Sequence, residues 1–293
     1  MMRNLLSVLL LVVIVFGCEN NTKSNLELIN QIDSIKNVTV TYKLEVDSEG
    51  SFLDSVSIEK KKVSDSQKVV YEENKIFKGD GFIKIINYYS DNENLIYSKT
   101  YSNELGIISI SEFWENDSLI TKGQSIGFKN NIAKDTISID YNYIFNPNNL
   151  LENLNISSKL LNEKEYGNLT SINYDENGRV TSEYLIQKND TLRETNYKYE
   201  QDNLKVKSII DYNEGLLRVL EYDKNGYIVQ EELFKESLES IVKTMEQHYT
   251  TDSKGQILKI DIVALPSGIK KFYIFKRVKN PTESKDIKNP EMI

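Results

Sequence analysis

Apolar and polar residues alternate in short runs between residues 37 and 145. The clearest run is Val38–Val46, in which every second residue from Val38 onward is apolar. A period of two places those side chains on one face of a β-strand and the intervening residues on the other face. The following residues, Asp47–Gly50, have the composition of a tight turn.

Six further runs with this alternation predict strands in the same part of the chain. They lie at Val69–Glu72, Phe82–Tyr89, Leu95–Tyr101, Ile107–Trp114, Leu119–Gly123 and Thr136–Phe145. Segments rich in Gly, Asn and Asp separate them, and these residues favour turns. Short strands joined by such turns predict a meander of hairpins and therefore an antiparallel sheet. The basic run Lys60–Lys62 is interpreted as a solvated strand end or turn.

The alternation stops after residue 145, where leucines recur at a spacing closer to that of a helix. They are Leu150, Leu151, Leu154, Leu160 and Leu161. We therefore predict a short helical connector near 150–162.

This connector suggests a division of the chain into regions. An N-terminal antiparallel sheet region would span 37–145, the connector 146–165, and a C-terminal region of hairpin repeats 166–278. The polar segment 279–293 contains two prolines and is predicted to be a disordered tail.

Two stretches of the C-terminal region have nearly the same sequence. Tyr174-Asp-Glu-Asn-Gly178 and Tyr222-Asp-Lys-Asn-Gly226 each place a tyrosine four residues before a glycine, and Tyr199 stands at the same distance before Asn203. Glycine adopts positive φ freely, asparagine is the next best residue there, and aspartate caps a turn through its own side chain. Each unit is therefore predicted to be one hairpin that needs neighbours to bury its face.

The Tyr-Asp-x-x-Gly-x-(Val/Ile) pattern resembles the YD repeat of the Rhs family, and also the Tyr/Gly hairpin repeats of MORN-like proteins. The resemblance covers roughly Tyr166 to Ile262. It implies strands that curve into a β-shell, but complete shells contain far more repeats, and no toxin domain follows here. We therefore expect an all-β fold in which hairpins form a curved open sheet or a partial barrel.

The first eighteen residues have the organisation of an export signal. Arg3 supplies a positive charge, and Leu5–Phe16 is an apolar run too short to span a bilayer as a helix. Val15-Phe16-Gly17-Cys18 resembles the lipobox of bacterial lipoproteins. That resemblance implies removal of a signal peptide, residues 1–17, and acylation of Cys18. The alternatives are an ordinary signal peptide and a buried N-terminal helix.

A lipidated Cys18 predicts a protein anchored in the bacterial cell envelope, with the outer membrane as the expected location and residues 18–36 as a tether. Two or more acyl chains anchor a protein stably, whereas one chain holds it only weakly. The membrane is therefore one expected partner. The sequence does not indicate whether the protein lies on the periplasmic or the outer face of that membrane. The formal net charge is −8 and the basic residues form no stripe, so we expect no nucleic-acid partner.

Residue sets for common catalytic and cofactor sites are missing from the sequence. His248 is the only histidine, and Gly-rich phosphate loops, HExxH and CxxC are absent. Part of a calcium-loop template occurs at Glu221, Asp223, Asn225 and Gly226, although its flanks have strand character. The many acidic residues do not exclude a catalytic pair of carboxylates such as glycosidases use, but no particular pair stands out. We predict a protein without a cofactor or metal that is not an enzyme.

A second short pattern, Asp followed by Ser or Thr and an apolar residue, recurs along the chain. It is similar to the O-glycosylation motif of exported proteins in Bacteroidota. The hydroxyls that match are Ser34, Ser55, Ser118, Thr136 and Thr191. The alternative is local structure, in which Asp ends a turn and Ser or Thr begins a strand.

Two hypotheses for function follow. In the first, the chain is a non-enzymatic binding or scaffold protein that meets an envelope protein or a glycan, because repeats produce wide surfaces and tyrosine offers contact area at low entropy cost. Tyr174, Tyr199 and Tyr222 are the candidate contact residues. In the second, the chain is a carrier of lipid or lipoprotein, or a hydrolase, with its ligand in the curved sheet.

Overall fold

A computed structural model of the chain describes residues 29, 32, 35–64, 66, 68–160, 165–236 and 241–280. Its elements are eighteen β-strands. In chain order they are β1 (Val38–Val46), β2 (Phe52–Val63), β3 (Val69–Lys78), β4 (Gly81–Tyr89), β5 (Leu95–Ser102), β6 (Gly106–Asn116), β7 (Leu119–Lys129), β8 (Ile132–Phe145), β9 (Leu151–Leu160), β10 (Glu165–Tyr174), β11 (Val180–Gln187), β12 (Asp190–Glu200), β13 (Asn203–Asp211), β14 (Leu216–Tyr222), β15 (Ile228–Glu236), β16 (Ile241–Thr251), β17 (Ile257–Ala264) and β18 (Lys270–Lys279). Within the described residues, no helix is long and apolar enough to span a membrane.

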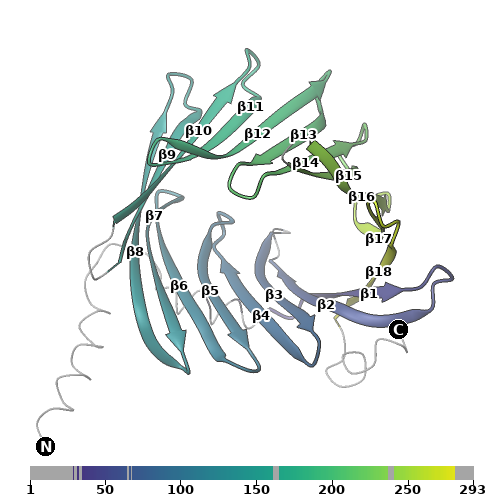
Figure 1. Cartoon of the computed structure of the whole chain (residues 1–293). Coiled ribbons are helices and arrows are strands. Elements are labelled where there is room, and N and C mark those ends of the chain that lie inside the picture. Colours follow the sequence, from purple (N-terminus) through teal and green to yellow (C-terminus); the bar gives the residue numbers. More distant parts are fainter. Residues whose placement is uncertain are drawn as a thin grey trace, which may run out of the picture.

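Each strand is hydrogen-bonded to the next one in the chain, and β1 also pairs with β18 (Figure 1). The prediction of an all-β antiparallel meander is confirmed. The expectation of an open sheet or partial barrel is wrong, because the β1–β18 ladder runs from Thr39 opposite Lys279 to Val46 opposite Phe272 and closes the sheet. Closure pairs the backbone groups that two free edges would have left unpaired.

The helical connector is also wrong. Residues 151–160 form β9, which pairs with β8 on one side and β10 on the other. Polar residues at 153, 155 and 157 alternate with Leu154 and Ile156, so a period of two is present beside the leucine spacing. Backbone partners on both sides favour this strand over a helix, and residues 161–164 lie outside the described residues.

A second strand, β2, is also missing from the sequence-based prediction. Lys60–Lys62 lies near the end of β2, paired with Val38–Val40 of β1, so the strand end and not the turn is observed, although Lys62 is buried. The predicted turn at Asp47–Gly50 does separate two strands, β1 and β2. The disordered tail was predicted for residues 279–293, of which 281–293 lie outside the described residues, whereas β18 includes Lys279.

The hydrophobic core is small and lies along two stretches of the wall. One cluster consists of Val40, Tyr42 and Leu44 of β1, at the seam with β2 and β18. The other consists of Val70 and Tyr71 of β3, on which Ile32 packs. The Lys62 ammonium group donates a hydrogen bond to the carbonyl oxygen of Ile32 at 3.3 Å. The last part of the predicted tether is therefore docked on the barrel wall.

Hairpin turns alternate between the two ends of the barrel. We call the end at which β1 begins and β18 ends the proximal end, and the end with the β1–β2 turn the distal end. Six large hydrophobic side chains in the described chain are more than half exposed, and all lie at distal turns or next to them. They are Leu53 (57% exposed), Leu105 (59%), Ile132 (61%), Tyr212 (51%), Ile241 (63%) and Ile269 (60%).

Candidate functional site

The repeated Tyr-Asp-x-x-Gly motif forms a five-residue turn stabilised by its aspartate. The Asp175 carboxylate oxygen Oδ1 accepts the backbone N–H groups of Asn177 and Arg179, each at 2.9 Å. Gly178 has a φ of 75°, in the left-handed region that glycine tolerates best. The prediction that Asp caps each turn and Gly supplies positive φ is confirmed at this site.

The same turn recurs beyond the two clean copies that the sequence displays. In each case an Asp or Asn side-chain oxygen accepts the N–H groups two and four residues later, and a residue of positive φ stands between. The other members start at Asp47, Asn146, Asp223 and Asp252. Two of them, at residues 47 and 146, lie outside the predicted repeat region. The turn at Asp47 was predicted as a turn but not as a member of the repeat, because it precedes the repeats, and the one at Asn146 was missed because it has Asn in place of both Asp and Gly.

These caps change the acidity of the aspartates that make them. Backbone hydrogen bonds from Arg179, Tyr227 and Gln256 hold the pKa values of the carboxyl groups of Asp175, Asp223 and Asp252, respectively, below their usual range. The cause is that an N–H donor stabilises the ionised form. At Asp223, one of the partial calcium-template residues, the carboxylate accepts hydrogen bonds from its own turn. Among the described residues, no group of His, Cys, Asp and Glu is placed to hold a metal ion.

The tyrosine of the motif connects one hairpin to the preceding one. The Tyr174 hydroxyl donates to the carbonyl oxygen of Leu151 at 2.7 Å, and the Tyr199 hydroxyl donates to that of Val180 at 2.9 Å. Tyr143, which the repeat pattern does not include, donates to Ile120 in the same way at 2.8 Å. Two of the three candidate contact tyrosines therefore use their hydroxyl groups inside the sheet.

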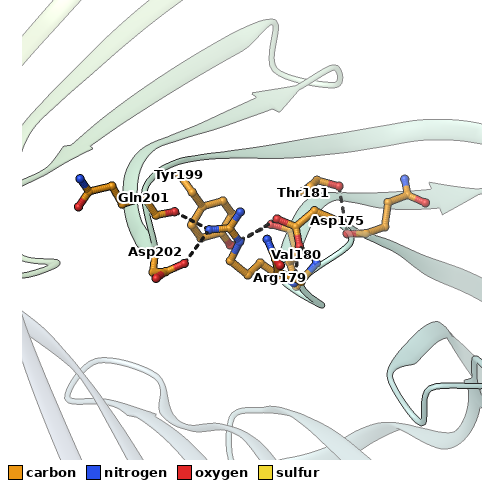
Figure 2. A network of polar contacts seen from close by, with 9 residues as sticks. Asp175, Arg179, Val180, Thr181, Tyr199, Gln201 and Asp202 are labelled. Atoms are coloured by element: carbon orange, nitrogen blue, oxygen red, sulfur yellow. Dashed lines mark hydrogen bonds and ion pairs between the residues drawn. The ribbon is translucent and has the colours of Figure 1, made fainter.

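Arg179 joins two neighbouring repeats (Figure 2). Its guanidinium group forms an ion pair with Asp175 at 2.7 Å and donates to the carbonyl oxygen of Gln201 at 2.6 Å. It also lies 4.8 Å from the centroid of the Tyr199 ring, within the range of a cation–π contact. Sequence analysis did not single out Arg179, although its position directly after the motif glycine would have been a signal.

A buried carboxylate lies between the last repeats. The Glu231 side chain is 5% exposed. Its Oε1 accepts two hydrogen bonds from Arg218, at 3.0 and 2.8 Å, and its Oε2 accepts the Tyr249 hydroxyl at 2.7 Å. Burial and this hydrogen bond raise the pKa of Tyr249. The group is fully satisfied and serves to hold β14, β15 and β16 together.

The two faces of the wall can be followed from strand to strand, because cross-strand partners place their side chains on the same face. Tyr42 shares one face with Ile58, and further along this face Tyr71, Tyr88 and Tyr97 are successive partners. We call it the Tyr42 face. The opposite face contains Tyr197 and Tyr199, and the partner series Tyr249, Ile260, Tyr273, Glu45. We call it the Tyr199 face.

Apolar side chains are distributed differently over the two faces along the wall. In β4 both faces contain them, with Phe82 and Ile86 on the Tyr42 face next to Lys84, and Ile83 and Ile85 on the Tyr199 face. In β8 and β9 the two faces differ. There Ile139, Tyr141, Tyr143, Leu154 and Ile156 lie on the Tyr199 face, opposite to Ser138, Asp140, Asn142, Asn155 and Ser157 on the Tyr42 face. Apolar side chains therefore lie on both the inner and the outer surface of the wall.

The candidate glycosylation sites fall in different environments. Ser118 is an exposed residue of the β6–β7 turn, and Thr191 is exposed near the start of β12. Ser55 and Thr136 lie inside β2 and β8 and are half-buried. Turn chemistry thus accounts for the Asp-Ser motif at Ser118 but does not account for the motifs within strands. Ser34 and Cys18 lie outside the described residues.

No family model matches the chain, and no curated protein matches its sequence. Among solved structures, a porin-like protein from Bacteroides uniformis is 15% identical, with a TM-score of 0.40, over 83% of this chain and 98% of that chain. The complex TcdB2-TccC3-Cdc42 is 10% identical, with a TM-score of 0.30, over 79% of this chain and 15% of that chain. A DUF1329 family protein from Desulfovibrio piger is 10% identical, with a TM-score of 0.20, over 89% and 92%. Likenesses at these TM-scores support no argument about function.

Proposed function

We propose that this chain is a lipid-anchored protein of the bacterial envelope, whose barrel is a non-enzymatic scaffold for a protein or glycan partner. The observation that supports a binding role is the group of exposed aliphatic side chains at the distal turns, where Leu53, Leu105, Ile132, Ile241 and Ile269 are each more than half exposed. Exposed apolar surface of this kind is typical of sites at which a protein meets a partner.

The barrel is proposed to stand outside the bilayer, with the acyl chains of Cys18 as its attachment. Charged side chains occupy mid-strand positions on both faces, such as Lys60 and Glu73 on the Tyr42 face and Lys207 and Arg218 on the Tyr199 face. A strand that spans a bilayer keeps its lipid-facing side apolar instead.

Docking of Ile32 favours one orientation of the barrel. Ile32 packs on residues at the proximal start of β3. The proximal end is therefore proposed to face the membrane, and the distal end to project towards the partner.

The anchor is tested by metabolic labelling of cells with a palmitate analogue. We expect the wild-type chain to be labelled and to sediment with membranes, and Cys18→Ser to lose the label. The anchor proposal is wrong if Cys18→Ser retains the label.

The scaffold role is tested in cells with a photo-crosslinking amino acid at neighbouring positions that point to opposite faces. Ile156 and Asn155 of β9 form one such pair, with the apolar residue on the Tyr199 face, and Ile110 and Ser111 of β6 form another, with the apolar residue on the Tyr42 face. The outward-facing apolar position is expected to form an adduct with one specific protein or glycan, whereas its neighbour serves as the matched control. Adducts that are absent from both apolar positions would refute the proposal.

The carrier hypothesis is the second candidate, because apolar side chains lie on both faces of the wall, such as Ile86 on the Tyr42 face and Ile156 on the Tyr199 face, and therefore also line the lumen. In that case the inward-facing apolar position would form lipid adducts. If only lipid adducts form, and no macromolecular partner is found on the outward face, the carrier hypothesis is correct and the scaffold hypothesis is wrong.

A further inference from the structure

Two lysines face each other directly in the first half of the wall. Lys75 of β3 and Lys84 of β4 are cross-strand partners, so their side chains lie side by side on the Tyr42 face. Lys99 of β5 is diagonal to Lys84, because its partner is Ile86. Like charges at directly opposite positions destabilise an antiparallel pair. Pairing of these strands therefore does not require three lysines at these positions, and the fold tolerates them there.

Carboxylates near this cluster neutralise only part of its charge. The Glu73 oxygen Oε2 is 3.9 Å from the Lys84 ammonium nitrogen and also accepts the Tyr71 hydroxyl at 2.8 Å. Glu112 is diagonal to Lys99 across the β5–β6 ladder. Within the described part of the chain, no carboxylate forms an ion pair with Lys75 or Lys99. The cluster keeps an excess of positive charge.

Aromatic rings border the same lysines. The Lys75 ammonium nitrogen lies 4.1 Å from the centroid of the Phe82 ring and 4.9 Å from that of Phe77. The Phe82 and Tyr101 ring centroids are 6.1 Å apart. All three rings are half-buried on the Tyr42 face towards the distal end. Positive charge and apolar ring surface are thus adjacent in one place.

We propose that the Lys75–Lys84–Lys99 cluster binds a single-chain amphiphile with an anionic head group. The head would lie between the ammonium groups, which donate charge-assisted hydrogen bonds, and the chain would lie along Phe77, Phe82 and Tyr101. An anion at this point removes the repulsion between Lys75 and Lys84, which neither ring can do. The site goes beyond the scaffold role and depends neither on acylation of Cys18 nor on the tyrosines of the opposite face.

The test uses the full chain in a non-ionic detergent and equilibrium dialysis against labelled decanoate. Decanol and acetate are the matched probes, since one lacks the charge and the other lacks the chain. The variant is Lys75→Gln combined with Lys84→Gln. Lys78→Gln is the control, because Lys78 lies on the same strand but is exposed at the distal turn.

Wild-type protein is expected to bind decanoate saturably, and decanol and acetate at least about tenfold more weakly. The double variant should lose at least about tenfold in decanoate affinity while Lys78→Gln binds as wild type does. Equal decanoate affinity in the double variant, equal binding of decanol, or partition into micelles without saturation would each overturn the proposal. Lys99→Gln leaves the contact of Lys75 with Phe82 in place and provides the same comparison if the double variant does not fold.

Discussion

The wall is held together differently on its two sides. At the β18–β1–β2 seam and in β3 to β5, the buried side chains include large apolar ones such as Tyr42, Leu44, Tyr71 and Ile96. From β6 to β16, the buried side chains in the described chain are instead the polar Ser182, Thr195 and Glu231. The same antiparallel ladder continues through both regions. Apolar burial therefore stabilises one side, and repeated polar contacts stabilise the other.

These two ways of stabilising the wall, apolar burial and polar contacts, have a common cause. A single-layered wall offers each strand little depth in which to bury a side chain, and apolar burial needs a second layer. Ile32 provides that cover for Val70 and Tyr71, and neighbouring side chains of β2 and β18 pack against the cluster of β1. Elsewhere, the hydroxyl groups of Tyr143, Tyr174 and Tyr199 connect hairpins to their neighbours.

The largest expected effect is the loss of stability when a buried side chain is truncated, and it should differ between the two sides of the barrel. Tyr42→Ala removes a side chain that is 1% exposed and should lower the free energy of unfolding by about 3–5 kcal/mol, through lost burial and a residual cavity. Urea denaturation followed by circular dichroism measures it. The half-buried Tyr199, replaced by Ala, should cost clearly less. Equal costs would show that the seam is not the apolar core of the wall.

The turns provide the next comparison. Gly226→Ala adds a methyl group that meets no atom within 4 Å, so its cost comes only from the positive φ of 79°. That cost should be about 1–2 kcal/mol in thermal or urea denaturation. Gly167→Ala is the control, since its Cβ would also meet nothing within 4 Å and its φ is not in the left-handed region. If Gly167→Ala destabilises the protein as much as Gly226→Ala does, the positive φ of Gly226 is not the cause of the loss.

A smaller effect is expected from the tyrosine contacts between hairpins. Tyr199→Phe removes the hydrogen bond to Val180 and should cost about 0.5–1.5 kcal/mol. Tyr101→Phe is the matched control on the other side of the barrel, because the Tyr101 ring contacts Phe82 and its hydroxyl has no described partner. The difference between the two variants in denaturation midpoint isolates the polar contact. No difference would mean that these hydroxyl groups do not stabilise the repeat side.

The smallest effect is a dependence of stability on pH in the acidic range. Folding lowers the pKa values of Asp175, Asp223 and Asp252, so their contribution is present above the unfolded-state pKa of about 3.8. It is lost as the pH falls through the lowered folded-state values. The urea midpoint should therefore drop below about pH 4. The triple Asp→Asn variant should show a weaker drop, since an amide oxygen still caps the turn, as Asn146 does.

Much of the local structure follows from the sequence alone. Period-two alternation predicts β1 with its observed bounds, and the Tyr-Asp-x-x-Gly spacing predicts turns whose caps and positive φ the structure confirms. These features depend on contacts within a few residues, which is the range that a sequence pattern records. The strand β9 was missed because its leucine spacing also fits a helix, and only its partners β8 and β10 resolve the ambiguity.

Tertiary structure alone decided three features: the closure of the barrel, the docking of Ile32, and the juxtaposition of Lys75 with Lys84. Each joins positions whose proximity depends on strand register and on the accumulated curvature of the sheet. A shift of one residue in register would move Lys84 to the opposite face of the wall, away from Lys75, without any change in sequence. The sequence by itself determined hairpins, turns and a candidate anchor at Cys18. The arrangement of those hairpins into one closed wall comes from long-range backbone pairing.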